Sequence, residues 1–138
     1  MGKLIGQARM GARYLLAAVR LFNGTAALLA PRTLGKRLGV DPDHSPAAVY
    51  VLRLFGVRTI YVGAELLLKR GDHLRDALRV APAIHLSDTL SAVAAGATGQ
   101  LPKKSARTAT IISGVNVLLA LLASSEPNPA GCRRPWKR

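Results

Sequence analysis

The stretch VYVLRLFGVRTIYVGAELLL, residues 49–68, is long and apolar enough to cross a lipid bilayer. It nevertheless contains three ionisable side chains, Arg53, Arg58 and Glu65. Apolar side chains near the membrane centre gain roughly 0.3–0.6 kcal/mol each, whereas one central Arg costs about 2.5–3.5 kcal/mol. The segment alone therefore inserts weakly, and we expect other helices to supply partners for its charges.

Four apolar runs of about this length follow one another along the chain. They predict an all-α fold, a bundle of four transmembrane helices over about 14–31, 46–68, 80–99 and 108–125. The last run has no ionisable residue between Arg107 and Glu126, which makes it the strongest transmembrane signal. A short interfacial helix could form over 33–38. Residues 126–138 are predicted to be a disordered basic cytoplasmic tail.

Basic residues are abundant, because twenty Lys and Arg against seven Asp and Glu give the chain a formal net charge of +13. A nucleic-acid-binding protein usually gathers such residues on one face or one helix. Here most of them lie between the apolar runs or at their ends. This placement favours a membrane protein over a basic nucleic-acid-binding helical protein, which is kept as an alternative.

Lys and Arg are also divided unevenly between the two ends of such a bundle. With four crossings, the N-terminus, the turn after the second helix and the C-terminal tail share one side, which holds eleven of them. The other side holds six, Arg32, Lys36, Arg37, Lys103, Lys104 and Arg107. Cytoplasmic segments carry the excess of Lys and Arg. Both termini are therefore predicted to be cytoplasmic, in a multi-pass protein of the plasma (inner) membrane.

Depth in the bilayer predicts which internal charges meet. Arg58 and Asp88 lie near the middle of consecutive runs that have opposite directions, so a hairpin turning near residue 73 places them at equal depth. Glu65 and His85 are about one helical turn out of this register. Ionisable groups inside a membrane usually pair with one another. We therefore predict two pairs, Arg58 with Asp88 and Glu65 with His85, which either join the hairpin or relay protons.

Other polar residues have no partner that the sequence identifies. Arg20 lies near mid-depth in the first run with Asn23 close by, and it could share Asp88, reach a lipid phosphate or meet an acid on another subunit. Arg53 can extend to the headgroups. Asn116 can hydrogen-bond across a helix interface, and small residues at four-residue spacing, such as Ala92 and Gly96, favour close helix packing. The residues predicted to bind headgroups are Arg133, Arg134, Trp136, Lys137 and Arg138.

No motif for a catalytic site, a metal or a cofactor stands out in the chain. Asp41, Asp43 and His44 form the sequence DPDHSP, which is better interpreted as turn and helix-cap chemistry than as a metal site. Cys132 is the single cysteine, which excludes an internal disulfide framework. We therefore expect no cofactor and no metal.

Residues 47–123 resemble small four-helix membrane proteins of actinobacteria, which are DoxX-like in architecture and mostly of unknown function. The resemblance rests on LRLFGVRTIYVGAELLL with Gly56, Arg58 and Gly63, and on LRVAPAIHLSDTLSAVAAGATG with Asp88. It implies a four-helix bundle and leaves the activity open.

The leading functional hypothesis is a non-enzymatic accessory subunit of a larger cell-envelope complex, for example one of lipid import or respiration. It rests on the small size, the excess of Arg over carboxylates within the runs and the lack of a catalytic motif. The expected partners are the lipid bilayer and other membrane subunits, in a hetero-oligomer without nucleic acid. The alternative is a small membrane carrier or redox-linked membrane enzyme that uses Arg58, Glu65, His85 and Asp88.

Overall fold

The computed structural model describes residues 1–125, and every regular element in this range is an α-helix. The helices are α1 (Gly2–Leu29), α2 (Pro31–Arg37), α3 (Pro46–Leu68), α4 (Gly71–Ala97) and α5 (Lys103–Ser124). Four of them are long, and α2 has only 7 residues. The predicted all-α class is therefore confirmed for the described part of the chain.

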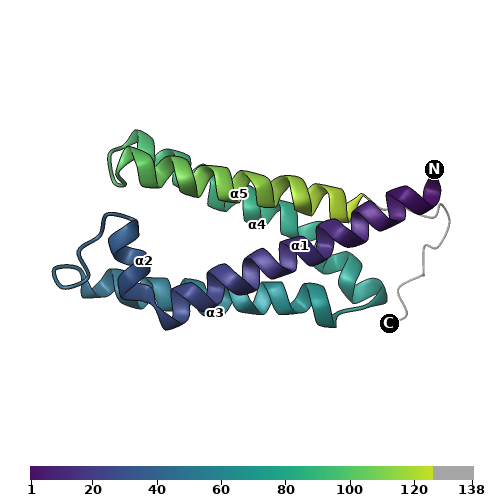
Figure 1. The fold of residues 1–138 in the computed structure, drawn as a ribbon, viewed down its shortest axis with the longest axis horizontal. Helices are drawn as coiled ribbons and strands as arrows, with labels where there is room; N and C mark the ends of the chain where they lie inside the picture. The colour runs from purple at the N-terminus through teal and green to yellow at the C-terminus, as the bar shows by residue number, and fades with distance from the viewer. Residues whose placement is uncertain (126–138) are drawn as a thin grey trace, which may run out of the picture.

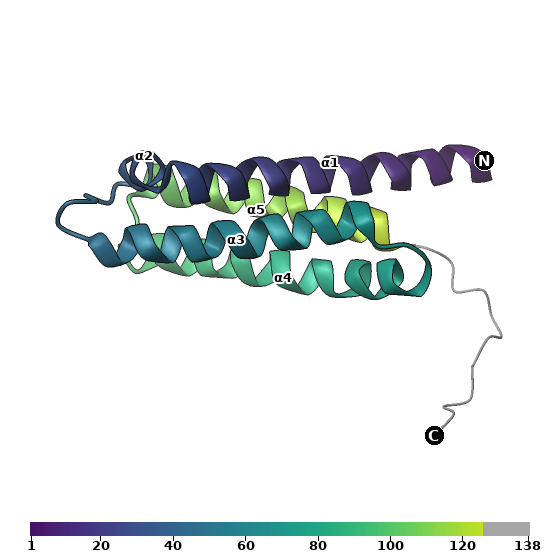
Figure 2. The ribbon, with the colours of Figure 1, turned by 90° about the horizontal axis from the view of Figure 1, so that it is seen from below.

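The four long helices form two antiparallel pairs, α1 with α3 and α4 with α5 (Figures 1 and 2). The pairs meet where α1 contacts α5, whereas α3 and α4 touch each other little. The N-terminus, the α3–α4 turn and the end of α5 lie at one end of the bundle. At the other end, the Ser105 hydroxyl donates a hydrogen bond to the Arg37 carbonyl at the end of α2 (3.2 Å).

Three long helices extend beyond the apolar runs that predict them. α1 begins at Gly2, α4 at Gly71 and α5 at Lys103, each ahead of its run. The added turns of α4 are amphipathic, because Leu74 and Leu78 pack into the core while the charged residues beside them face outward. A search for apolar runs finds the apolar part of a helix and misses its polar ends. Only α3 has the predicted bounds, 46–68.

α1 and α3 approach each other closely at glycine residues. A Cβ atom added to Gly56 would lie 2.7 Å from the carbonyl oxygen of Gly24. One added to Gly24 would lie 2.8 Å from the backbone nitrogen of Ile60, and one added to Gly63 would lie 3.1 Å from the Cβ of Arg20. Glycine at these positions lets the two backbones come together. The contact also places Arg20 of α1 against α3.

The α4–α5 pair uses small residues in a similar way. A Cβ atom added to Gly96 would lie 2.6 Å from the Cβ of Ala106, and Ala92 and Ala120 are buried. Ala92 and Gly96, which are four residues apart, therefore both lie in a helix interface. Gly114 of α5 differs, because an added Cβ atom would have no neighbour within 4 Å.

The interior of the bundle is polar in places, and its outside is largely apolar. Most buried apolar residues are alanine. The buried polar side chains are Arg20, Thr59, His85 and Asn116. Large apolar side chains on the outside of the four long helices include Phe22, Tyr61, Leu90 and Leu118. Water-soluble proteins rarely bury an Arg and normally place large apolar side chains inside.

Replacing Gly56 by Ala is expected to destabilise the α1–α3 pair, because the added methyl group would overlap backbone atoms of α1. We expect a loss of roughly 1–3 kcal/mol in the free energy of unfolding, measured by thermal unfolding in mild detergent with circular dichroism. Gly114→Ala is the matched control and should be neutral or up to about 1 kcal/mol more stable. Equal stability of the two variants would contradict the close approach.

Candidate functional site

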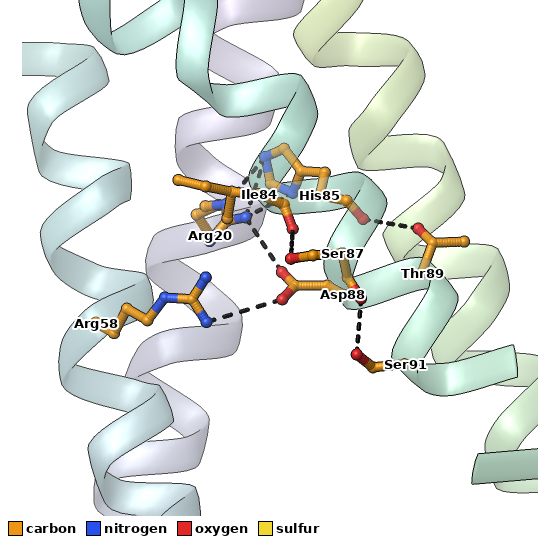
Figure 3. A network of polar contacts seen from close by, with 8 residues as sticks. All are labelled: Arg20, Arg58, Ile84, His85, Ser87, Asp88, Thr89 and Ser91. Atoms are coloured by element: carbon orange, nitrogen blue, oxygen red, sulfur yellow. Dashed lines mark hydrogen bonds and ion pairs between the residues drawn. The ribbon is translucent and has the colours of Figure 1, made fainter. Parts of the chain in front are cut away.

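Four side chains from three helices meet between the two helix pairs (Figure 3). Arg20 comes from α1, Arg58 from α3, and His85 and Asp88 from α4. Arg20 Nη2 lies 3.6 Å from Asp88 Oδ2, and Arg58 Nη1 lies 3.8 Å from Asp88 Oδ1. The structure thus places the predicted pair Arg58–Asp88 within ion-pair distance. One carboxylate bridges two guanidinium groups.

The members of this network differ in their exposure. Arg20 is 3% exposed and His85 is 1% exposed. The side chain of Asp88 is 23% exposed, and that of Arg58 is 50% exposed. A buried Arg must be paired inside the protein, whereas a half-exposed one can also meet a group from outside. Arg20 is therefore the internal cation of the network and Arg58 the accessible one.

One ring nitrogen of His85 accepts a hydrogen bond from Arg20 and so holds its guanidinium group in place. The Nε of Arg20 donates to His85 Nε2 at 3.2 Å, and Nη2 of Arg20 lies 2.5 Å from Nδ1. A guanidinium group can only donate hydrogen bonds, so the ring nitrogen that accepts must be unprotonated. The cation of Arg20 also disfavours a second positive charge on the ring. His85 is therefore a neutral acceptor here, which disfavours the proton relay.

The structure does not form the second predicted pair, Glu65 with His85. Glu65 is instead paired with Lys69, the C-cap residue of α3, which lies four residues further along the chain. The register explains the difference. In an antiparallel helix pair, residues at the same level have numbers that add to a constant, which is 146 for Arg58 with Asp88. The same sum holds for Val62 with Ile84 and for Leu66 with Val80, and these four residues line one groove. Glu65 and His85 lie outside this register, and a partner at i+4 is closer.

Three hydroxyl side chains near the network are satisfied by their own helix. The hydroxyl groups of Ser87, Thr89 and Ser91 donate to the backbone carbonyls of Ile84, His85 and Ser87 (Figure 3). This is the common behaviour of Ser and Thr inside helices. They add no further charge or free donor to the site.

The other predicted contact residues lie apart from this network. Asn23 is half-buried, Arg53 is exposed, and Asn116 is buried with no hydrogen-bond partner for its amide oxygen among residues 1–125. Arg20, whose partner the sequence left open, contacts Asp88 and His85. The predicted headgroup-binding residues Arg133, Arg134, Trp136, Lys137 and Arg138 lie outside the described residues.

Arg13 has a role that the sequence did not indicate. Its guanidinium group donates to the carbonyl oxygens of Leu66 (2.5 Å), Leu67 (3.4 Å) and Lys69 (3.4 Å) at the end of α3. The last carbonyls of a helix have no partner within it and carry partial negative charge. Arg13 therefore caps α3 from α1. An antiparallel alignment of the two helices through Gly24 and Gly56 would have indicated it.

The acidic turn before α3 forms the hydrogen bonds of a turn, but the N-cap residue Ser45 makes no side-chain cap hydrogen bond, contrary to the expected cap chemistry. The Asp43 backbone N–H donates to Asp41, and the His44 ring contacts the same carboxylate at 2.6 Å. These two contacts hold the pKa of Asp41 below its ordinary value. Arg32 pairs with Asp43 at 2.7 Å. Within residues 1–125, no three His, Cys, Asp or Glu side chains are close enough to hold a metal ion.

No family model, curated protein or solved structure matches the chain. By length and composition alone, α5 passes as a membrane span, and α1 passes together with α2, which is bent by 104° from it. One or two such helices are weak evidence for a membrane location.

The network predicts an order of thermal stability for variants of Asp88 and Arg58. Asp88→Asn leaves two guanidinium groups without a carboxylate and is expected to cost about 3–5 kcal/mol. Arg58→Gln keeps the Arg20–Asp88 pair and should change stability little. The double variant has one fewer unpaired cation, so it should be more stable than Asp88→Asn alone. Thermal unfolding in detergent measures all three, and a wild-type-like Asp88→Asn variant would refute the stabilising role of the network.

Proposed function

We propose that this chain is a multi-pass integral membrane protein whose four long helices cross the bilayer. The observation that carries the proposal is the distribution of polar and apolar side chains, with Arg20 and His85 buried, Asp88 partly buried beside them, and large apolar side chains on the outside. In hydrocarbon, ionisable groups face the interior of a bundle and pair there. In water, so much exposed apolar surface would drive association.

Helix lengths fit this arrangement. α3, α4 and α5 contain 23, 27 and 22 residues, which correspond to about 33–40 Å of helix. A hydrocarbon core is about 30 Å thick. Two of the three charged residues of α3 are paired, Arg58 with Asp88 and Glu65 with Lys69, and the third, Arg53, is exposed nearer the start of the helix. Their pairing offsets part of the insertion cost.

The charges at the two ends of the bundle favour one orientation. Together with the four Lys and Arg of residues 126–138, which are predicted on the same side, the end that carries the N-terminus and the α3–α4 turn has eleven Lys and Arg against six at the end that carries α2. By the positive-inside rule, the first end faces the cytoplasm. The basic residues stand at the headgroup levels, which suits anionic lipids better than a nucleic acid.

Within the membrane, the chain acts as a non-enzymatic accessory subunit of a larger cell-envelope complex. Two features of the network support this role over a carrier or a redox enzyme. His85 serves as a neutral hydrogen-bond acceptor for Arg20 and not as a neighbour of two carboxylates. Arg58 shares its carboxylate with Arg20 and remains half-exposed, as a contact residue for another subunit would be.

Membrane insertion predicts a definite labelling pattern in intact cells. In a Cys132→Ser background, His44→Cys and Gln100→Cys variants should react with a membrane-impermeant maleimide, whereas a His73→Cys variant should react only after permeabilisation. All three side chains are exposed in the structure. The protein should also stay in the membrane during carbonate washing. Release by carbonate, or equal labelling of positions 44 and 73, would contradict the proposal.

The subunit role predicts the size of the native particle. Solubilised from its own membranes in a mild detergent, the tagged 14.6 kDa chain should migrate on native gels in a particle much larger than a dimer. Other chains should co-migrate with it in fixed proportion. A clean monomer or homodimer would refute the role and leave membrane insertion untouched.

A further inference from the structure

An apolar groove runs between α3 and α4, where these two helices touch each other little. It encloses about 260 Å³, and Val62, Leu66, Val80 and Ile84 form its apolar lining. Glu65, Lys69 and Asp76 lie at the end near the α3–α4 turn. Arg58 and Asp88 lie one helical turn beyond Val62 and Ile84 on the same two helix faces. The groove therefore leads from charged residues at the membrane surface to the ion network.

The network has one positive charge too many. Arg20 and Arg58 are cations, Asp88 is the one carboxylate paired with either of them within residues 1–125, and His85 is neutral. The remaining acidic residues of this range have basic partners of their own: Asp41 with His44, Asp43 with Arg32, Glu65 with Lys69, Asp72 with Arg75 and Asp76 with Arg79. A cation left in hydrocarbon attracts a carboxylate from outside.

A second copy of the chain does not supply that carboxylate. In a dimer with its twofold axis along the membrane normal, each group meets groups at its own depth. At the depth of Arg58, the second copy offers another network of the same surplus charge. Glu65 lies about 10 Å from that level along α3 and is engaged by Lys69. The occupant of the groove must therefore be a different molecule.

We infer that the α3–α4 groove receives a transmembrane helix of another subunit, and that an Asp or Glu in this helix pairs with Arg58. The inference rests on the proposed membrane function and specifies its partner. A carboxylate in hydrocarbon is as costly as the cation it meets, so the pair offsets the cost on both sides. Apolar side chains about one and two turns from the acid would pack between Val62 and Ile84, then between Leu66 and Val80.

The test uses synthetic transmembrane helices as defined probes. The full chain, labelled at Cys132, is reconstituted in phosphatidylcholine vesicles with Leu/Ala peptides of about 20 residues that carry one central Glu, Gln or Lys. Energy transfer to a labelled peptide measures association in mildly alkaline buffer. We expect the Glu peptide to bind roughly tenfold more tightly than the Gln peptide.

Three variants make the result specific. Arg58→Gln should abolish the preference for the Glu peptide while circular dichroism stays unchanged, since Asp88 keeps Arg20 as its partner. Arg58→Glu should reverse the preference in favour of the Lys peptide. Arg53→Gln, which removes an exposed Arg of the same helix, should leave the preference as in the wild type.

Other occupants give different results, each of which overturns the inference. Equal binding of the Glu and Gln peptides excludes an acidic helix. Arg58-dependent enrichment of phosphatidylglycerol without peptide binding identifies an anionic lipid. Tighter association of the labelled chain with itself than with the Glu peptide identifies a second copy. Vesicles are first washed with carbonate, so a chain that never inserts refutes the membrane proposal, whereas an inserted chain without peptide preference refutes only this inference.

Discussion

The carboxylate of Asp88 is the group on which the arrangement of the bundle depends. Its two oxygens face guanidinium groups from α1 and α3, while Asp88 itself belongs to α4. The α1–α3 pair contributes both cations, and the α4–α5 pair contributes the anion and the imidazole. In the membrane location that we propose, apolar contacts would set few constraints on how the two helix pairs meet, because lipid tails are as apolar as Leu. A directional ion network supplies that constraint.

Close packing acts mainly within each helix pair, and ion pairing acts between the two pairs. Within each pair, glycine and alanine let the backbones approach, as at Gly24 with Gly56 and at Gly96 with Ala106. Between the pairs, the ion network connects α3 with α4, which otherwise have few contacts with each other. Arg13 adds a second polar link within the α1–α3 pair, at the end of α3. Close packing thus builds the pairs, and the ion network joins them together with a shared apolar core that includes Leu16, Leu78 and Ala120.

The sequence predicts well at which level along the bundle a residue lies, and poorly which neighbouring helix its side chain faces. Equal distance from the turn brought Arg58 and Asp88 together, because antiparallel helices of known length leave little freedom in register. Which residues of a helix face which neighbour depends on packing, and the sequence alone did not place α1 beside α3. The close approach at Gly56 and Gly63 is what places Arg20 there. The expected pair of Glu65 with His85 does not form because Lys69, four residues along the chain, lies nearer to Glu65.

The unequal exposure of the two cations separates their roles. Arg20 extends from α1 and is buried against α4, where it contacts His85 and Asp88. Any change at Arg20 must therefore disturb the interior of the bundle. Arg58 is half-exposed and pairs with the same carboxylate, so its removal leaves Asp88 paired with Arg20. A purely structural network would need only one Arg for one Asp. The second Arg adds a desolvation cost with no matching anion among residues 1–125, and this cost is understandable if an acidic partner completes the network.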